Sequence, residues 1–203
     1  MHTHKTLLMT FTRNPELGKV KTRLAQGIGE KAALEVYITL LEHTESVLQQ
    51  VQTDKCVWYS VAVRENDLWN DTIYQKKAQI GNDLGERMQY AFADAFRNQY
   101  EKVIIIGSDL YDLQPKHIEE AITALDNNDI VIGPAKDGGY YLLGMKTLHK
   151  EAFLPKEWGK ENVLKDTLND LKTEKIHLLE TLNDIDYTED LLPYETFKKY
   201  ILC

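Results

Sequence analysis

Short apolar runs alternate along the chain with longer stretches whose apolar residues recur at helical spacing. The runs at residues 7–11, 103–106 and 130–132 are largely apolar on both faces and end at polar residues or glycine. Such runs are typical of strands in a parallel sheet that helices cover on both sides. Residues 30–51 and 84–96 show the helical spacing. The alternation therefore predicts an α/β fold with a mostly parallel central sheet.

The same patterns predict the remaining elements. Further strands are expected at residues 56–63, 73–80, 140–145 and 176–179, and further helices from Pro115, near residues 161–171 and from Thr188, which we interpret as an N-cap. A chain of 203 residues is within the usual size of one domain. We therefore expect a single domain over residues 1–203.

Composition and charge narrow the class of protein. Hydrophobic residues make up 43% and charged residues 28% of the chain, which is typical of a globular protein. The net charge of −8 repels nucleic acid and anionic membranes. Cys56 and Cys203 form no metal-binding or redox pair, and no stretch approaches the length of a membrane span. We expect a cytoplasmic protein with no nucleic-acid or membrane partner, and the sequence leaves its oligomeric state open.

The loop after the first strand carries most of the local positive charge. In a parallel α/β sheet, ligands bind outside the carboxyl ends of the strands. Residues 13–23 place four cations beside one acid, Glu16, in an otherwise acidic chain. Lysine and arginine there can form charge-assisted bonds to phosphate oxygens, and the helix into which the loop leads offers backbone N–H groups and a positive dipole end. The loop indicates a phosphate site, and the alternative is a solvated basic surface.

Two acidic segments are candidates for a metal site. Asp109 follows a buried strand, in the sequence Gly-Ser-Asp, and Mg²⁺ needs only one or two protein carboxylates. Alternation along an extended backbone aims Asp184 and Asp186 the same way. We interpret Asp190 as part of the first turn of the last helix, which makes Asp186 the better second ligand. The alternative for Asp109 is that it only caps its turn.

A glycine-rich loop follows another strand at residues 133–141. Gly138 and Gly139 let the backbone approach a ligand closely, and Lys136 and Asp137 could address phosphate and hydroxyl groups. Asp137 is also the nearest candidate for a catalytic base. The alternative is an ordinary turn between strands, with Tyr140 in the core.

Five segments in this order carry a resemblance to a known family. They are residues 11–15 with 18–24, then 81–88, 107–109, 133–141 and 184–186. The chain resembles, over nearly its whole length, a bacterial family of nucleotide-diphospho-sugar transferase-like proteins that are described as glycosyltransferases linked to arsenosugar biosynthesis. Two departures concern loop geometry, because Tyr111 stands where the family usually has proline and Gly159 where it usually has serine.

The resemblance implies a fold and a set of site residues. It implies a GT-A-like three-layer α/β/α sandwich in which Asp109 and Asp186 are the catalytic acids and hold Mg²⁺ or Mn²⁺ against a diphosphate. The nucleotide would be bound by Arg13, Gly18, Lys21, Thr22, Arg23 and Ser108. The substrate would be bound by Arg87, Lys136, Asp137, Gly138, Gly139 and Tyr140.

Three functions are compatible with these residues. The first is metal-dependent glycosyl transfer from a nucleotide-diphospho-sugar to a small-molecule acceptor. The second is nucleotidyl transfer from a nucleoside triphosphate to a phosphorylated small molecule with release of pyrophosphate, because residues 21–24 resemble guanylyltransferases that activate phospholactate. The cationic first loop likewise resembles that of sugar-nucleotide pyrophosphorylases. The third is a nucleotide-binding module without catalysis.

Overall fold

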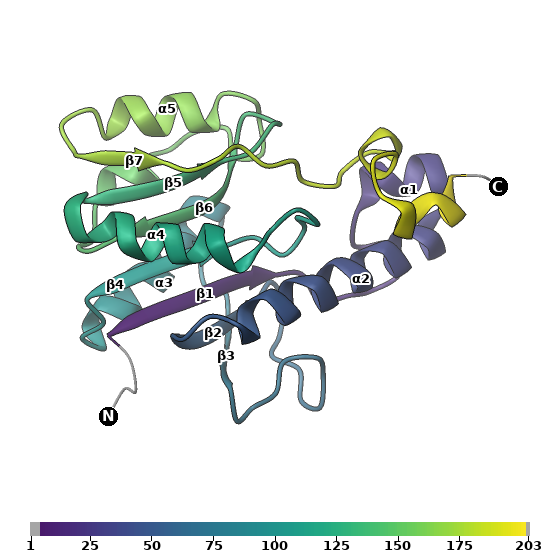
Figure 1. Ribbon diagram of the computed structural model, residues 1–203, viewed down its shortest axis with the longest axis horizontal. Helices are drawn as coiled ribbons and strands as arrows, with labels where there is room; N and C mark the ends of the chain where they lie inside the picture. The colour runs from purple at the N-terminus through teal and green to yellow at the C-terminus, as the bar shows by residue number, and fades with distance from the viewer. Residues whose placement is uncertain (1–4, 202–203) are drawn as a thin grey trace.

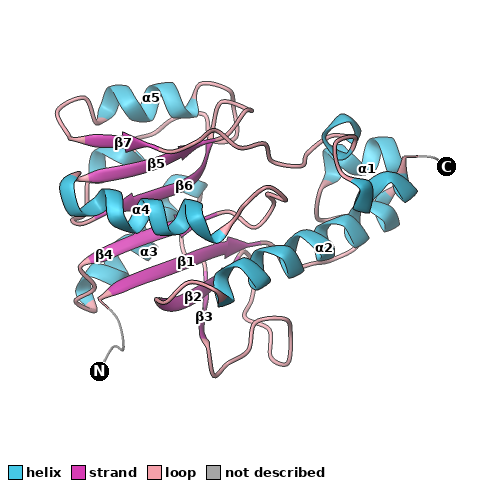
Figure 2. Cartoon of the chain, viewed as in Figure 1, coloured by secondary structure: helices cyan, strands magenta, loops and turns pink. Residues whose placement is uncertain are grey.

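One sheet runs through the body of the molecule (Figures 1 and 2). In the computed structural model, which describes residues 5–201, its strand order is β3-β2-β1-β4-β6-β5-β7. The strands are β1 (Thr6–Thr12), β2 (Asp54–Tyr59), β3 (Tyr74–Ala78), β4 (Lys102–Ile106), β5 (Ile130–Pro134), β6 (Tyr140–Met145) and β7 (Ile176–Leu178). Neighbouring strands are parallel except where β6 pairs with β4 and β5. The predicted mostly parallel sheet is confirmed.

Helices cover both faces of this sheet (Figure 1). The α-helices are α1 (Thr22–Ile28), α2 (Glu30–Gln49), α3 (Leu84–Arg97), α4 (Pro115–Asn127) and α5 (Val163–Asp170). Short 3-10 helices are η1 (Lys150–Phe153), η2 (Thr188–Leu191) and η3 (Glu195–Tyr200). One hydrophobic cluster joins α2 and α4 to the sheet, and another joins α3, η1 and α5 to its other face. This is the predicted three-layer α/β/α sandwich.

Alternating residues of the central strands explain why both faces are covered. In β1, Leu7 and Met9 pack in the cluster of α3, whereas Leu8 packs in the cluster of α2. In β4, Val103 and Ile105 face the α3 side and Ile104 faces the α2 side. Successive side chains of a strand point to opposite faces, so a run that is apolar throughout is stable only between two layers of helices.

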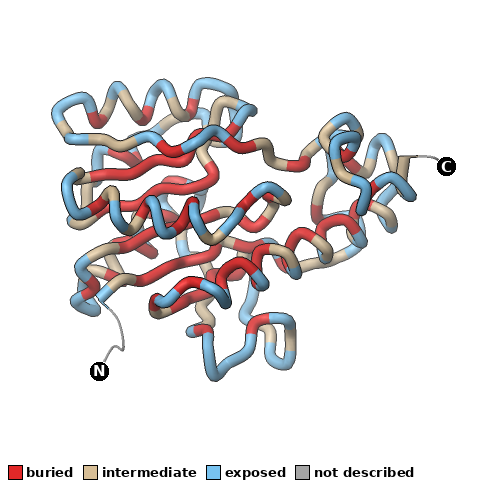
Figure 3. The backbone as a smooth tube through the Cα atoms, viewed as in Figure 1, coloured by how far each residue is buried: buried red, intermediate tan, exposed pale blue. Residues whose placement is uncertain are grey.

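A smaller unit extends beyond the sheet, and we call it the terminal lobe. It consists of α1, the first half of α2, η2 and η3, and lies past the carboxyl end of β1 (Figure 1). Its buried core is formed by Leu24, Ala33, Val36, Leu40, Ile185, Leu191 and Phe197. The rear half of α2 packs on the sheet instead, and Figure 3 shows its buried residues continuing from one unit to the other. The lobe therefore faces the sheet edge at which ligands bind in this class of fold.

Three sequence predictions about elements were wrong in detail. The second strand ends at Tyr59 and does not reach residue 63, since Val61 is 72% exposed. The last helix is two 3-10 turns, and Thr188 is the first residue of η2, with Tyr187 at the N-cap. The helices α1 and η1 were not predicted as separate elements.

None of the helices within residues 5–201 combines the length and the apolar character that crossing a bilayer needs. Even α2, with 20 residues, lacks a sufficiently long apolar stretch.

Candidate functional site

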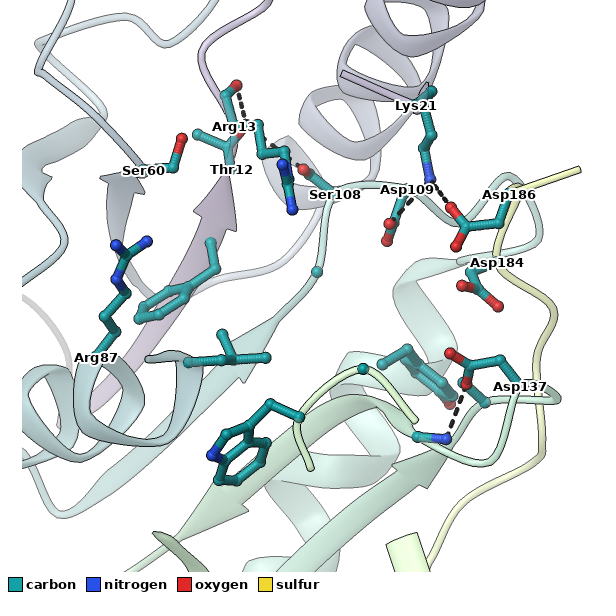
Figure 4. A pocket seen from close by; sticks show the side chains of 18 of the residues that line it. Thr12, Arg13, Lys21, Ser60, Arg87, Ser108, Asp109, Asp137, Asp184 and Asp186 are labelled. Carbon is teal, nitrogen blue, oxygen red and sulfur yellow. Dashed lines mark hydrogen bonds and ion pairs between the residues drawn. The ribbon is translucent and has the colours of Figure 1, made fainter. Parts of the chain in front are cut away.

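A cavity of about 910 Å³ opens at the carboxyl edge of the sheet, between the body and the terminal lobe (Figure 4). Its walls come from the ends of β1, β2, β4 and β5, from the first turn of α3 and from the lobe. Among the predicted site residues, the lining includes Arg13, Lys21, Thr22, Arg23, Arg87, Ser108, Asp109, Asp137, Gly139, Tyr140 and Asp186. The lining does not include Gly18, Lys136 or Gly138.

Three carboxylates converge at one end of the cavity, and we call them the acid cluster: Asp109, Asp184 and Asp186. One oxygen from each lies within 4.8 Å of the others. Asp109 belongs to the loop after β4, and the other two belong to the segment after β7. The backbone N–H of Ile185 donates to the carbonyl oxygen of Asp109 at 3.2 Å, which fastens the two segments together.

Alternation along the chain explains how the acid cluster is aimed. Ile185 is fully buried in the core of the terminal lobe, so its two neighbours project to the other side of the extended segment. Asp190 accepts hydrogen bonds from the backbone N–H groups of Asp186 and Tyr187 at 3.0 and 2.8 Å. Asp190 thus has the structural position predicted for it. Asp184 was recognised in the sequence as sharing the direction of Asp186 but was not selected as a ligand.

Lys21 connects the terminal lobe to this acid cluster (Figure 4). Its Nζ donates to Oδ2 of Asp109 at 3.0 Å and to Oδ1 of Asp186 at 2.9 Å. The side chain of Lys21 is only 5% exposed. Its backbone is left-handed, with φ 46°, directly before α1. Arg23, whose side chain is 50% exposed, donates to Oδ2 of Asp186 at 3.1 Å.

The ion pairs give two carboxylates of the acid cluster, Asp184 and Asp186, different pKa values. Burial alone would raise the pKa of Asp186, but Lys21 and Arg23 hold it below its usual value. Burial would lower the pKa of Lys21, but Asp109 and Asp186 raise it instead. For Asp184, burial and then the nearby carboxylates raise the pKa to about 7. Asp184 is thus the member of the cluster in which the charged form is destabilised.

Two arginines, which we call the arginine pair, line the cavity away from this cluster: Arg13 and Arg87 (Figure 4). Arg13 directly follows β1, and Arg87 lies in the first turns of α3. Arg87 donates from Nε to the carbonyl oxygen of Gly81 at 3.0 Å and from Nη1 to the side-chain oxygen of Gln79 at 3.4 Å. Within residues 5–201, neither arginine forms an ion pair with a carboxylate.

Buried hydroxyl groups fix the strand ends that carry these residues. The hydroxyl of Tyr37 on α2 lies 3.1 Å from Oγ1 of Thr12 and 3.3 Å from Oγ of Ser108, and accepts the backbone N–H of Arg13 at 2.9 Å. This network ties β1 to the loop that carries Asp109. Ser108 therefore lies at the site, as predicted, with its hydroxyl engaged in positioning the loop. Tyr37 was missed because its spacing is that of an ordinary core residue of a helix.

The glycine-rich loop after β5 closes the side of the cavity nearest Asp184. Oδ1 of Asp137 accepts the backbone N–H of Gly139 at 2.8 Å. Gly138 has φ +89°, and a Cβ there would meet the carbonyl oxygen of Glu161 at 2.0 Å, so this position requires glycine. The exposed Lys136 contributes its backbone N–H, which donates to the carbonyl oxygen of Leu182 at 3.0 Å and anchors the segment before the acid cluster.

Comparisons with known proteins agree with this architecture. Residues 40–160 match a family described as uncharacterized protein conserved in bacteria (DUF2064). A crystal structure from Desulfovibrio desulfuricans G20, provisionally named a nucleotide-diphospho-sugar transferase, is 31% identical, with a TM-score of 0.87 over 97% of this chain and 89% of that one. The 4-diphosphocytidyl-2C-methyl-D-erythritol synthase of Anaerococcus prevotii shares the fold, with a TM-score of 0.61 at 13% identity over 96% of this chain and 98% of that one.

Curated relatives are similar over part of the chain. The 2-phospho-L-lactate guanylyltransferase of Methanocaldococcus vulcanius is 24% identical over 64% of this chain. The match spans 58% of that relative's length. These relatives and the Desulfovibrio neighbour are named as transferases, and the predicted resemblance is confirmed.

Proposed function

The chain belongs to the bacterial DUF2064 family, and on this premise we propose that it transfers a glycosyl group from a nucleotide-diphospho-sugar with the help of a divalent metal. The observation that carries the proposal is the meeting of Asp109, Asp184 and Asp186 beside Lys21 and Arg23. Carboxylates and cations at one strand edge are what a metal-bound diphosphate requires. The name of the Desulfovibrio neighbour supports the same donor class.

The donor set suits Mg²⁺ or Mn²⁺. Both are hard cations that prefer oxygen ligands, and the acid cluster offers a carboxylate oxygen from each of three residues within 4.8 Å of one another. Asp109 and Asp186 would hold the ion, as the sequence predicted, and Asp184 would be a third ligand. When bound, the metal would neutralise charge on the departing diphosphate.

Different side chains around the cavity would bind the phosphates and the sugar of the donor. Lys21, Arg23 and Arg13 can donate charge-assisted hydrogen bonds to phosphate oxygens. The backbone N–H of Arg13 already donates to the hydroxyl of Tyr37. In the first loop, we therefore expect side chains to bind the phosphates more than backbone N–H groups do. Asp137, Gly139 and Tyr140 line the same cavity and would contact the sugar or the acceptor.

Nucleotidyl transfer is the second candidate, and the arginine pair favours it. A triphosphate together with a phosphorylated acceptor brings more negative charge than a nucleotide sugar, and Arg13 and Arg87 have no carboxylate partners among the described residues. The guanylyltransferase relatives point the same way. In this reaction the arginines would face the triphosphate or the acceptor phosphate, and pyrophosphate would leave.

Product analysis separates these proposals. The protein is incubated with Mg²⁺ or Mn²⁺, panels of nucleotide sugars or nucleoside triphosphates, and mixed small-molecule acceptors. Release of nucleoside diphosphate from a nucleotide sugar supports glycosyl transfer. Release of pyrophosphate alone would overturn it in favour of nucleotidyl transfer. Metal-dependent thermal stabilisation by nucleotides without any product would indicate a binding module.

A further inference from the structure

Three of the six carboxylate oxygens of the acid cluster are already bonded to side-chain cations. Lys21 bonds one oxygen of Asp109 and one of Asp186, and Arg23 bonds the second oxygen of Asp186. Asp184 has no ion pair with a cation among residues 5–201. The two acids that the sequence singles out as metal ligands are therefore neutralised by the protein itself.

The ammonium of Lys21 and a metal ion would compete for the same two oxygens. Mg²⁺ binds oxygen at about 2.0–2.1 Å. An ion at that distance from the oxygens that Nζ bonds at 3.0 and 2.9 Å would lie no more than about 5 Å from the ammonium. The two cations would repel strongly in a site where the lysine side chain is 5% exposed and poorly screened.

Arg23 presents a smaller obstacle than Lys21. Its guanidinium bonds one oxygen of Asp186 and its side chain is half exposed, so it can turn into solvent. Lys21 has no such exit, because removing its buried ammonium from Asp109 and Asp186 without a new anion leaves a buried charge unpaired. The phosphates of a nucleotide bound in the same cavity would supply that anion.

We propose that Lys21 is a resident counter-ion that keeps divalent metal out of the acid cluster until phosphate groups take over its ammonium, so that metal and nucleotide bind cooperatively. The proposal rests on the metal-dependent function above but needs no turnover. Lys21 is then a positioning residue: its ammonium bonds the carboxylates when no ligand is present and the phosphates when a nucleotide is bound. Removing the charge of Lys21 should therefore raise the affinity for metal in the absence of phosphate.

The first test is Mn²⁺ binding to the full chain without nucleotide, measured by calorimetry for the wild type and for Lys21→Met. Methionine keeps the length of the side chain and removes its charge. We expect the variant to bind Mn²⁺ at least about 10-fold more tightly, within the 5- to 150-fold range of ordinary coupling between sites. Arg23→Gln is the matched control, with a smaller gain. Equal or weaker binding by Lys21→Met would overturn the proposal.

A second test uses only the wild-type chain, in case the variant does not fold. Thermal unfolding is measured with Mg²⁺ alone, with inorganic pyrophosphate alone and with both. We expect the rise in Tm with both to exceed the sum of the separate rises. A rise with Mg²⁺ alone that equals the rise with both, or no rise with both, would overturn the proposal. Tighter Mn²⁺ binding by Lys21→Met, together with pyrophosphate as the only reaction product, would remove glycosyl transfer and leave this inference standing.

Discussion

The acid cluster and the arginine pair are built in opposite ways, although they line the same cavity. In the acid cluster, Asp109 and Asp186 are paired with Lys21 and Arg23 of the terminal lobe. The arginine pair has no carboxylate partners among the described residues, and Arg87 is oriented by neutral oxygen atoms. In our proposal the cluster exchanges its cationic partners when a ligand binds, whereas the two arginines can bind an anion without giving up an ion pair.

The largest expected effect comes from removing one charge from the acid cluster. We expect Asp109→Asn to abolish metal-dependent nucleotide binding, lowering the affinity by at least about 100-fold, since groups that merely orient metal ligands already contribute about 10- to 100-fold. Binding is measured by titration with Mn²⁺ present and with EDTA. The matched control is Asp112→Asn, in the same loop, where the carboxylate accepts the hydroxyl of Tyr194. Unchanged affinity in Asp109→Asn would remove Asp109 from the site.

A smaller effect is expected from the arginine pair, and it should be independent of metal. Arg13→Gln removes a cation that has no ion pair within residues 5–201. A hydrogen bond to a charged group contributes about 1.5–3 kcal/mol, so nucleotide affinity should fall about 10- to 100-fold. Calorimetry should show unchanged Mn²⁺ affinity.

Arg64→Gln is the control for that substitution, because Arg64 pairs with Glu16 and is absent from the lining of the main cavity. If Arg13→Gln weakened Mn²⁺ binding as much as it weakened nucleotide binding, the two ends of the cavity would not be independent. The contrast between the acid cluster and the arginine pair would then be wrong.

The sequence predicted much of the fold because burial on both faces is a local pattern. The runs around Leu8 and Ile104 are apolar throughout, and the strands there lie between two helical layers. The antiparallel direction of β6 was not predicted, because strand pairing depends on distant parts of the chain. Val61 shows the other limit, since an apolar residue after a strand can still be exposed.

The candidate site was predictable to a similar extent. Position after a strand placed Asp109 at the sheet edge, and alternation aimed Asp186 with Asp184. The pairing of Lys21 with both acids was not predictable, because it depends on the left-handed backbone before α1 and on the packing of the terminal lobe. The third acid, Asp184, became distinct only through its raised pKa and because it has no ion pair within residues 5–201.

That raised pKa gives a prediction about stability without metal. The pKa of Asp184 is about 7 in the folded chain and close to 3.8 in an unfolded one. Between these values the folded state binds the extra proton, so stability should fall as pH rises from about 4 to about 7. Asp184→Asn should remove this dependence and stabilise the metal-free protein at pH 8 by on the order of 1–2 kcal/mol, a value reduced for solvent screening.

Thermal unfolding in EDTA at pH 5 and pH 8 measures this effect. The difference in Tm between Asp184→Asn and the wild type should be larger at pH 8 than at pH 5. Asp137→Asn serves as the comparison, since one oxygen of Asp137 accepts the backbone N–H of Gly139. If the difference in Tm were the same at both pH values, burial and the acidic neighbours would not raise the pKa of Asp184.

The smallest effect is expected from Arg23, and it separates the two cations of the acid cluster. Its side chain is half exposed, and Asp186 keeps Lys21 as a partner when Arg23 is replaced. Its guanidinium also lies 5.9 Å from the ring centre of Tyr187, which is itself exposed. Exposed ion pairs contribute about 0–1 kcal/mol, so Arg23→Gln should lower Tm by no more than about 4 °C. The loss should shrink in high salt, because salt screens exposed charges. A loss that is much larger and insensitive to salt would show that Arg23, as well as the buried Lys21, holds the terminal lobe to the sheet.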